Sequence, residues 1–190
     1  MTINKEKQDQ HFPLITFDNP LRRLFLPPRL LTRPYVKEGQ TAADLGCGPG
    51  YYTLALAEYI SPGGKVYAVD SDGKAVRALE RKAAKRGLDN IETYAASAAD
   101  LSFIPGGSVD FVLSHGLLCS MAPKDREEAL SEMKRILKPD GLAYVSVARG
   151  PWSYVDDAAW EKILAGFSVT WRKRSILRTQ QAAVVSLKKR

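Results

Sequence analysis

The stretch Asp44-Leu-Gly-Cys-Gly-Pro-Gly50 constrains this chain more than any other part of its sequence. The small residues before it, 41–43, suit a buried strand, and residues 52–60 after it have the pattern of a helix. A strand that breaks into a glycine-rich turn and re-enters a helix is expected to leave unpaired backbone N–H groups facing outward. The glycines of the turn permit positive φ and close approach of a ligand: Gly46, Gly48 and Gly50. The pattern therefore predicts a small-molecule site.

A dinucleotide and a positively charged ligand are the two candidates for this turn. The dinucleotide fingerprint G-x-G-x-x-G has its third glycine where this chain has Tyr51, and a pyrophosphate gains nothing from a carboxylate at Asp44. A ligand that carries an ammonium and a sulfonium does gain from that carboxylate. Residues 44–50 resemble motif I of the class I S-adenosylmethionine-dependent methyltransferases, in the small single-domain group that reads D-x-G-C-G-x-G. The resemblance implies S-adenosylmethionine as the cofactor.

A second acid lies where a ribose-binding carboxylate is expected. The run Lys65-Val-Tyr-Ala-Val-Asp70 reads as a strand and ends in an acid about 20 residues beyond the glycine turn. A carboxylate in this place accepts hydrogen bonds from both ribose hydroxyls. Asp72 is a neighbouring alternative, but its setting before Gly73 favours the cap of the following helix. We therefore assign the ribose to Asp70.

Two further segments match the same family with departures. Residues 96–103 stand where the family has the adenine loop G-D-A-x-D-L-P-F, with Ser97 in place of the acid that accepts from the adenine amino group. A serine hydroxyl still accepts, and the N–H of Ala98 is expected to face the adenine ring. Residues 137–141 match the L-K-P-G-G turn before the fifth strand. The resemblance covers residues 35–148 and implies this cofactor-binding set: Asp44, Gly46, Cys47, Gly48, Gly50, Asp70, Ser71, Ser97, Ala98 and Ser114.

The order of expected elements predicts an α/β fold. Strands near 41–46, 65–70, 91–96, 109–115 and 141–148 alternate with helices near 52–60, 72–87, 123–137 and 153–165. Alternation of this kind favours a doubly wound parallel sheet. The tail breaks it with two strands, and the resemblance implies a Rossmann-like, seven-stranded, mostly parallel sheet of order 3-2-1-4-5-7-6 with a closing antiparallel hairpin. We expect one globular domain over 35–190 and an N-terminal arm or lid over 1–34.

One histidine lies where chemistry is expected. Methyl transfer from a sulfonium needs alignment and exclusion of water, and it needs a base only when the acceptor holds a proton. His115, at the end of the fourth strand, is the candidate catalytic residue, because its imidazole can take a proton from a hydroxyl or amine. The alternative is that His115 only lines the pocket. No spacing of histidine, cysteine and carboxylate residues indicates a metal site.

The formal net charge of +7, concentrated near the two ends, leaves the acceptor open. The leading hypothesis is a small-molecule acceptor. The alternatives are RNA or protein bound through the basic termini, a nicotinamide-dependent oxidoreductase, and a non-enzymatic binding module. The aromatic clamp and the Pro-Cys pair of nucleobase methylation are absent around residues 114–120, which disfavours nucleic acid. Two cysteines, no apolar leader and no membrane-spanning run lead us to expect a cytoplasmic protein.

Overall fold

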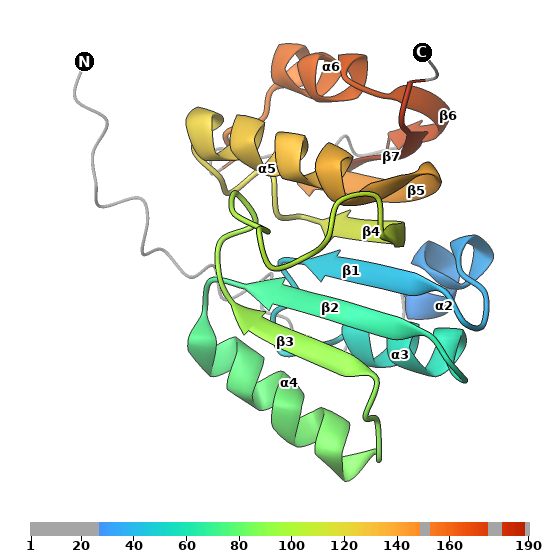
Figure 1. Cartoon of the computed structure of the whole chain (residues 1–190). Coiled ribbons are helices and arrows are strands. Elements are labelled where there is room, and N and C mark those ends of the chain that lie inside the picture. The colour runs from blue at the N-terminus through green and yellow to red at the C-terminus, as the bar shows by residue number, and fades with distance from the viewer. Residues whose placement is uncertain (1–26, 149–152, 175–179, 189–190) are drawn as a thin grey trace.

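The computed structural model describes residues 27–148, 153–174 and 180–188. In this part of the chain seven strands form one sheet in the order β3-β2-β1-β4-β5-β7-β6 (Figure 1). Strands β1 to β5 are parallel, and β7 runs antiparallel to both β5 and β6. The bounds are β1 Thr41–Leu45, β2 Lys65–Asp70, β3 Ile91–Ala95, β4 Val109–His115, β5 Leu137–Ala148, β6 Ser168–Arg174 and β7 Gln180–Ser186. The predicted fold class, strand order and closing hairpin are confirmed.

Helices cover both faces of the sheet (Figure 1). Their bounds are α2 Pro28–Leu31, the 3-10 turn η2 Arg33–Tyr35, α3 Thr53–Ile60, α4 Gly73–Lys85, α5 Pro123–Ile136 and α6 Asp157–Ala165. Leu54 of α3 and Leu79 of α4 share a buried cluster on one face. Met133 of α5 and Trp160 of α6 belong to the core cluster of the other face. The central strands are buried on both sides, which explains their apolar sequences.

Helix α4, expected near 72–87, extends from Gly73 to Lys85, with a cap before it and a glycine after it. The Asp72 carboxylate accepts from the N–H of Lys74 at 2.8 Å and caps the amino end. At the carboxyl end Gly87 has φ +65°, and its N–H and that of Leu88 donate to the carbonyls of Ala84 and Ala83. The expected role of Asp72 as a helix cap is confirmed, which leaves Asp70 free of that role.

Two element boundaries differ from the sequence expectation. Helix α6 begins at Asp157 rather than near 153, because the Asp156 carboxylate accepts from the N–H of Ala159 at 2.7 Å and caps the helix there. Strand β5 begins at Leu137 rather than near 141, because Leu137 already pairs with Val109 before the register between β4 and β5 shifts.

The described part of the expected N-terminal arm packs into the core. Leu31 and Val36 are 8% and 3% exposed and lie in one buried cluster with residues of α3. The ring of Tyr35 stacks on Phe111 of β4, with ring centroids 5.9 Å apart. Residues 27–36 are therefore joined to the main domain, and residues 1–26 of the predicted lid lie outside the described residues. The lid itself stays a prediction.

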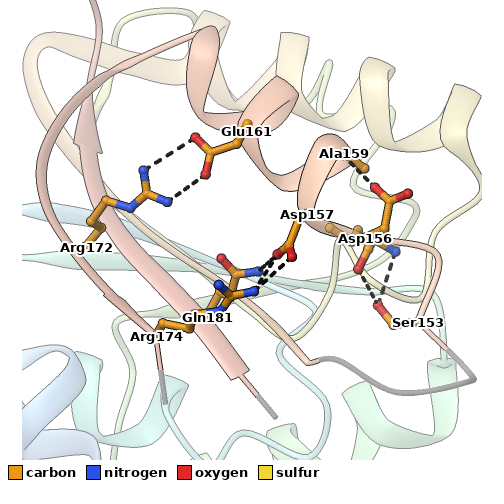
Figure 2. A network of polar contacts seen from close by, with 9 residues as sticks. Ser153, Asp156, Asp157, Ala159, Glu161, Arg172, Arg174 and Gln181 are labelled. Carbon is orange, nitrogen blue, oxygen red and sulfur yellow. Dashed lines mark hydrogen bonds and ion pairs between the residues drawn. The ribbon is translucent and has the colours of Figure 1, made fainter. Parts of the chain in front are cut away.

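Polar contacts fasten α6 to the closing hairpin (Figure 2). The Asp157 carboxylate accepts from Arg174 of β6 at 2.8 and 2.9 Å and from the Gln181 amide of β7 at 2.9 Å. Glu161, one turn later, accepts from Arg172 at 2.6 Å. The two ion pairs are exposed, but Gln181 is only 4% exposed. The contact from Asp157 to Gln181 therefore satisfies a buried amide.

Asp157→Ala is expected to destabilise the fold more than Glu161→Ala. Loss of the first carboxylate leaves the Gln181 amide without its side-chain acceptor in the described part of the chain, which costs about 1–3 kcal/mol. Loss of the second removes an exposed ion pair, for which less than about 1 kcal/mol is typical. Urea unfolding of both variants measures the difference, and equal destabilisation would contradict the role given to Gln181.

Candidate active site

The glycine turn between β1 and α3 has the expected backbone conformation but directs its N–H groups inward. Its glycines have positive φ: Gly46 +76°, Gly48 +51° and Gly50 +87°. The N–H groups of Gly46 and Cys47 donate to the Val69 carbonyl at 2.8 and 3.1 Å. The N–H of Gly50 donates to the Cys47 carbonyl at 3.1 Å. The expectation of outward-facing, unpaired N–H groups was wrong for these residues, because the end of β2 and the turn itself supply acceptors.

Asp70 joins the glycine turn to the end of β2. Its carboxylate accepts from the N–H of Gly48 at 2.8 Å through Oδ2 and from the N–H of Asp72 at 2.9 Å through Oδ1. A carboxylate has about four acceptor positions, so these two bonds leave capacity for further donors. Asp70 is half-buried and Ser71 beside it is exposed, which places both at the carboxyl edge of the sheet.

Asp44 lies beneath the turn at the end of β1. It is 3% exposed, and its carboxylate accepts from the Thr53 hydroxyl of α3 at 2.6 Å. Thr53 was not among the predicted residues, although a hydroxyl that opens the helix after the turn is a signal for such a contact. The structure thus fixes the orientation of the Asp44 carboxylate.

The Cys47 thiol is buried in the turn and is affected electrostatically by both acids. Burial raises its pKa well above the usual value for cysteine, and the charges of Asp44 and Asp70 raise it further. Both carboxylates therefore act on the same residue of the turn. Burial disfavours a charge of either sign, whereas the charges of the two carboxylates favour a positive one.

We expect Cys47 to resist alkylation, because the thiolate is the reactive form and a raised pKa suppresses it. Burial also raises the pKa of Cys119, so both thiols of the chain should behave alike. Mass spectrometry after iodoacetamide treatment at neutral pH should find the folded protein unmodified and the urea-unfolded protein modified twice. Rapid labelling of Cys47 in the folded protein would contradict the burial of its thiol.

The loop after β4 closes over the glycine turn. A Cβ added at Gly46 would lie 3.2 Å from Cβ and Cδ1 of Leu117. On the opposite side, a Cβ at Gly50 would overlap Cδ1 of Leu79. Positive φ therefore favours glycine at both positions, and close packing against Leu79 adds to this at Gly50.

The loop after β3 carries the predicted adenine residues. The exposed Ser97 accepts from the N–H of Ala99 at 3.2 Å through its hydroxyl, and Ala98 is 6% exposed. Asp100 accepts from the N–H of Ser102 at 3.1 Å, which is the bond of an Asx-type turn. Bonds within the loop thus shape it, and Ser97 is one of the residues that do so.

His115 ends β4 beside the glycine turn, and strand pairing gives it a partner. Its Nδ1 lies 2.7 Å from the hydroxyl of Ser146, its register partner on β5. The ring of Tyr52, which follows the glycine turn, packs edge-on at 5.0 Å between centroids. Ser114, the preceding residue, is completely buried, and its hydroxyl has no partner among the described residues. Sequence reasoning missed Ser146, because only the register of two strands brings it to His115.

Comparison with known proteins identifies the family. A profile described as "Methyltransferase domain" matches residues 42–141, more than half of the 190-residue chain. The chain belongs to this methyltransferase family. The predicted enzyme class, a class I S-adenosylmethionine-dependent methyltransferase, and the predicted cofactor are thereby confirmed.

The matches to curated relatives cover only part of the length of those relatives. Over 113 residues the chain is 36% identical to the demethylmenaquinone methyltransferase of Geobacillus stearothermophilus. The match covers 60% of this chain and 47% of that protein. Over 127 residues it is 33% identical to the nocamycin O-methyltransferase of Saccharothrix syringae. This match covers 67% of this chain and 42% of that protein. This methyltransferase chain therefore spans about half the length of the curated relatives it matches.

A solved structure has the same fold over nearly the whole chain. The S-adenosylmethionine-dependent methyltransferase from Aquifex aeolicus superposes with a TM-score of 0.77 at 23% identity, and covers 98% of this chain and 100% of that one. At this identity the likeness is evidence for the fold. Within residues 27–148, 153–174 and 180–188, no helix is long and apolar enough to cross a membrane.

The site of this methyltransferase fits a cationic ligand better than a phosphate. A pyrophosphate needs a row of outward N–H donors, whereas those of Gly46, Cys47 and Gly48 are bonded to β2. The carboxylates of Asp44 and Asp70 lie at the same turn and attract an ammonium or a sulfonium. The residues present therefore fit S-adenosylmethionine.

Proposed function

We propose that this chain transfers the methyl group of S-adenosylmethionine to a small-molecule acceptor. The observation that carries the proposal is the glycine turn, in which the amide groups point inward and two carboxylates bond to the turn and to the helix after it, Asp70 to the N–H of Gly48 and Asp44 to the Thr53 hydroxyl. This arrangement attracts positive charge and offers no cradle for phosphate, so it also counts against a nicotinamide-dependent oxidoreductase.

The proposed contacts follow the predicted cofactor-binding set. Asp44 attracts the positive end of the methionine part, and Asp70 with Ser71 accepts from the ribose. Ser97 and the N–H of Ala98 face the adenine. The turn and the fourth strand complete the wall: Gly46, Cys47, Gly48, Gly50 and Ser114. When bound, S-adenosylmethionine supplies a methyl group on a positively charged sulfur. The protein aligns the acceptor with that methyl group and excludes water, and Leu117, which lies on the turn, contributes to the exclusion.

A small-molecule acceptor is supported by the relatives and by the charge distribution. The curated relatives are named for demethylmenaquinone and nocamycin. The RNA or protein alternative depended on basic termini, yet Arg172 and Arg174 are paired with Glu161 and Asp157 of α6. These pairs weaken the positive field that would attract a polyanion.

Calorimetric titration with S-adenosylhomocysteine tests the proposal, with NADH as the control ligand. We expect micromolar binding of S-adenosylhomocysteine and no measurable binding of NADH, because only the first carries an ammonium for the acidic turn. Radiolabelled methyl transfer to a phenol and quinone panel, with total RNA and a protein lysate in parallel, then tests the acceptor. Preference for NADH would overturn the cofactor, and labelling of RNA alone would overturn the small molecule.

A further inference from the structure

The burial of Ser146 determines which group donates the hydrogen bond between Ser146 and His115. Ser146 is completely buried, and its Oγ lies 2.7 Å from His115 Nδ1. Among the described residues this nitrogen is the one side-chain partner of the hydroxyl. A buried hydroxyl that donates to nothing is destabilising. The Ser146 O–H therefore donates, and His115 Nδ1 accepts.

An imidazole that accepts at Nδ1 carries its proton at Nε2. In that tautomer the neutral ring has no lone pair at Nε2, so this nitrogen donates a hydrogen bond and accepts none. The ring is also held from the sides, since Tyr52 and Tyr144 pack against it at 5.0 and 6.3 Å between centroids. The bond from Ser146 to Nδ1 and the two ring contacts together restrict the orientation of the imidazole.

We propose that Ser146 holds His115 as the Nε2–H tautomer and that His115 donates a hydrogen bond to an anionic oxygen of the methyl acceptor instead of removing a proton from it. This inference rests on the proposed function and deepens it. Ser146 is a positioning residue in this scheme, and the acceptor belongs to the class of ionised phenols and enols.

Two other groups in this region of the described chain, the Tyr144 phenol and the Cys119 thiol, do not supply a base. Burial raises the pKa of the Tyr144 phenol, which stays protonated at neutral pH. The thiol of Cys119, which donates to the Gly116 carbonyl at 3.3 Å, also has a pKa raised by burial. A methyl acceptor that lies beside His115 should therefore already be deprotonated when it binds.

The chemistry of the acceptor atom narrows the class further. A neutral amine has one lone pair, and a hydrogen bond from Nε2–H would occupy the pair that must attack. An anionic oxygen has three, so it accepts from His115 with one and attacks with another, or passes charge to a conjugated carbon that attacks. The acceptor's electron pair forms the new bond to the methyl carbon, the carbon–sulfur bond breaks with its electrons on sulfur, and the two charges cancel. Attack by oxygen then needs no proton transfer, and attack by carbon releases its proton afterwards to water.

Nitrogen-15 NMR of the imidazole tests the tautomer without any activity. The chain has two histidines, so His11→Gln leaves His115 as the single imidazole. In the neutral ring we expect Nδ1 to resonate as an unprotonated nitrogen and Nε2 as a protonated one. Ser146→Ala should move the two shifts toward each other, and Ser146→Thr, which keeps the hydroxyl, should restore the original pattern. A protonated Nδ1 before any change at Ser146, or no effect of Ser146→Ala, overturns the assignment.

Binding of two quinones tests the role toward the acceptor. With protein saturated by S-adenosylhomocysteine, we expect 2-hydroxy-1,4-naphthoquinone, ionised at neutral pH, to bind on the order of ten- to a hundredfold tighter than 1,4-naphthoquinone. His115→Gln, which still donates but cannot act as a base, should keep most of this preference, and His115→Ala should lose it. Equal binding of the two quinones, or equal loss in both variants, overturns the donor role. Failure to bind S-adenosylhomocysteine overturns the proposed function instead, and the NMR result stands apart from it.

Discussion

Replacing Asp70 by alanine is expected to weaken S-adenosylhomocysteine binding by on the order of a hundredfold or more. The carboxylate holds the N–H of Gly48 at 2.8 Å and, in the proposed complex, the two ribose hydroxyls. Hydrogen bonds to a charged acceptor contribute about 1.5–3 kcal/mol each, and about 1.4 kcal/mol is tenfold in affinity. Loss of the bond to Gly48 also loosens the turn that receives the methionine part. Calorimetric titration of the variant measures the effect directly.

Two neighbouring changes serve as controls for Asp70. Asp70→Asn keeps the shape and one acceptor oxygen, so its loss should be intermediate. Asp72→Ala removes an acid two residues away that caps α4, so it should lower stability by about 1 kcal/mol and leave affinity within a few-fold. If Asp72→Ala weakened binding as much as Asp70→Ala, the ribose would have to be reassigned.

Gly50→Ala is expected to destabilise the protein by roughly 2–5 kcal/mol. Two effects add at this position. Its φ of +87° is unfavourable for any residue with a Cβ, and the new Cβ would overlap Cδ1 of Leu79, which is completely buried on α4. Since Leu79 packs in the interior, it has little room to withdraw. Urea unfolding gives the loss of stability, and S-adenosylhomocysteine titration shows whether the turn still binds.

Gly87→Ala separates the two effects. Gly87 also has a positive φ, +65°, but a Cβ there would meet nothing within 4 Å. Its substitution should therefore cost only the backbone strain, about 1–2 kcal/mol. The excess cost of Gly50→Ala is then the clash with Leu79, and a Leu79→Ala background should remove that excess. Equal losses of stability for the two substitutions would show that Leu79 can move aside without cost.

Sequence reasoning succeeded where the role of a residue depends only on its neighbours in the chain. Asp72 marks the amino end of α4 because a cap depends on adjacent backbone alone. Glycine at 46 and 50 likewise follows from the turn. The direction of the turn's N–H groups could not be predicted, because Val69, the acceptor of two of them, lies on another strand. Ser146 was missed for the same reason.

The inward bonding of the glycine turn has a consequence for the entropy of ligand binding. The amides of Gly46, Cys47 and Gly48 are already held by β2, so the turn has its shape before any ligand arrives. A loop that must first become ordered gives up part of the gross interaction energy to do so, and this one does not. Most of the attraction of the two carboxylates is therefore available to distinguish a charged sulfur from a neutral one.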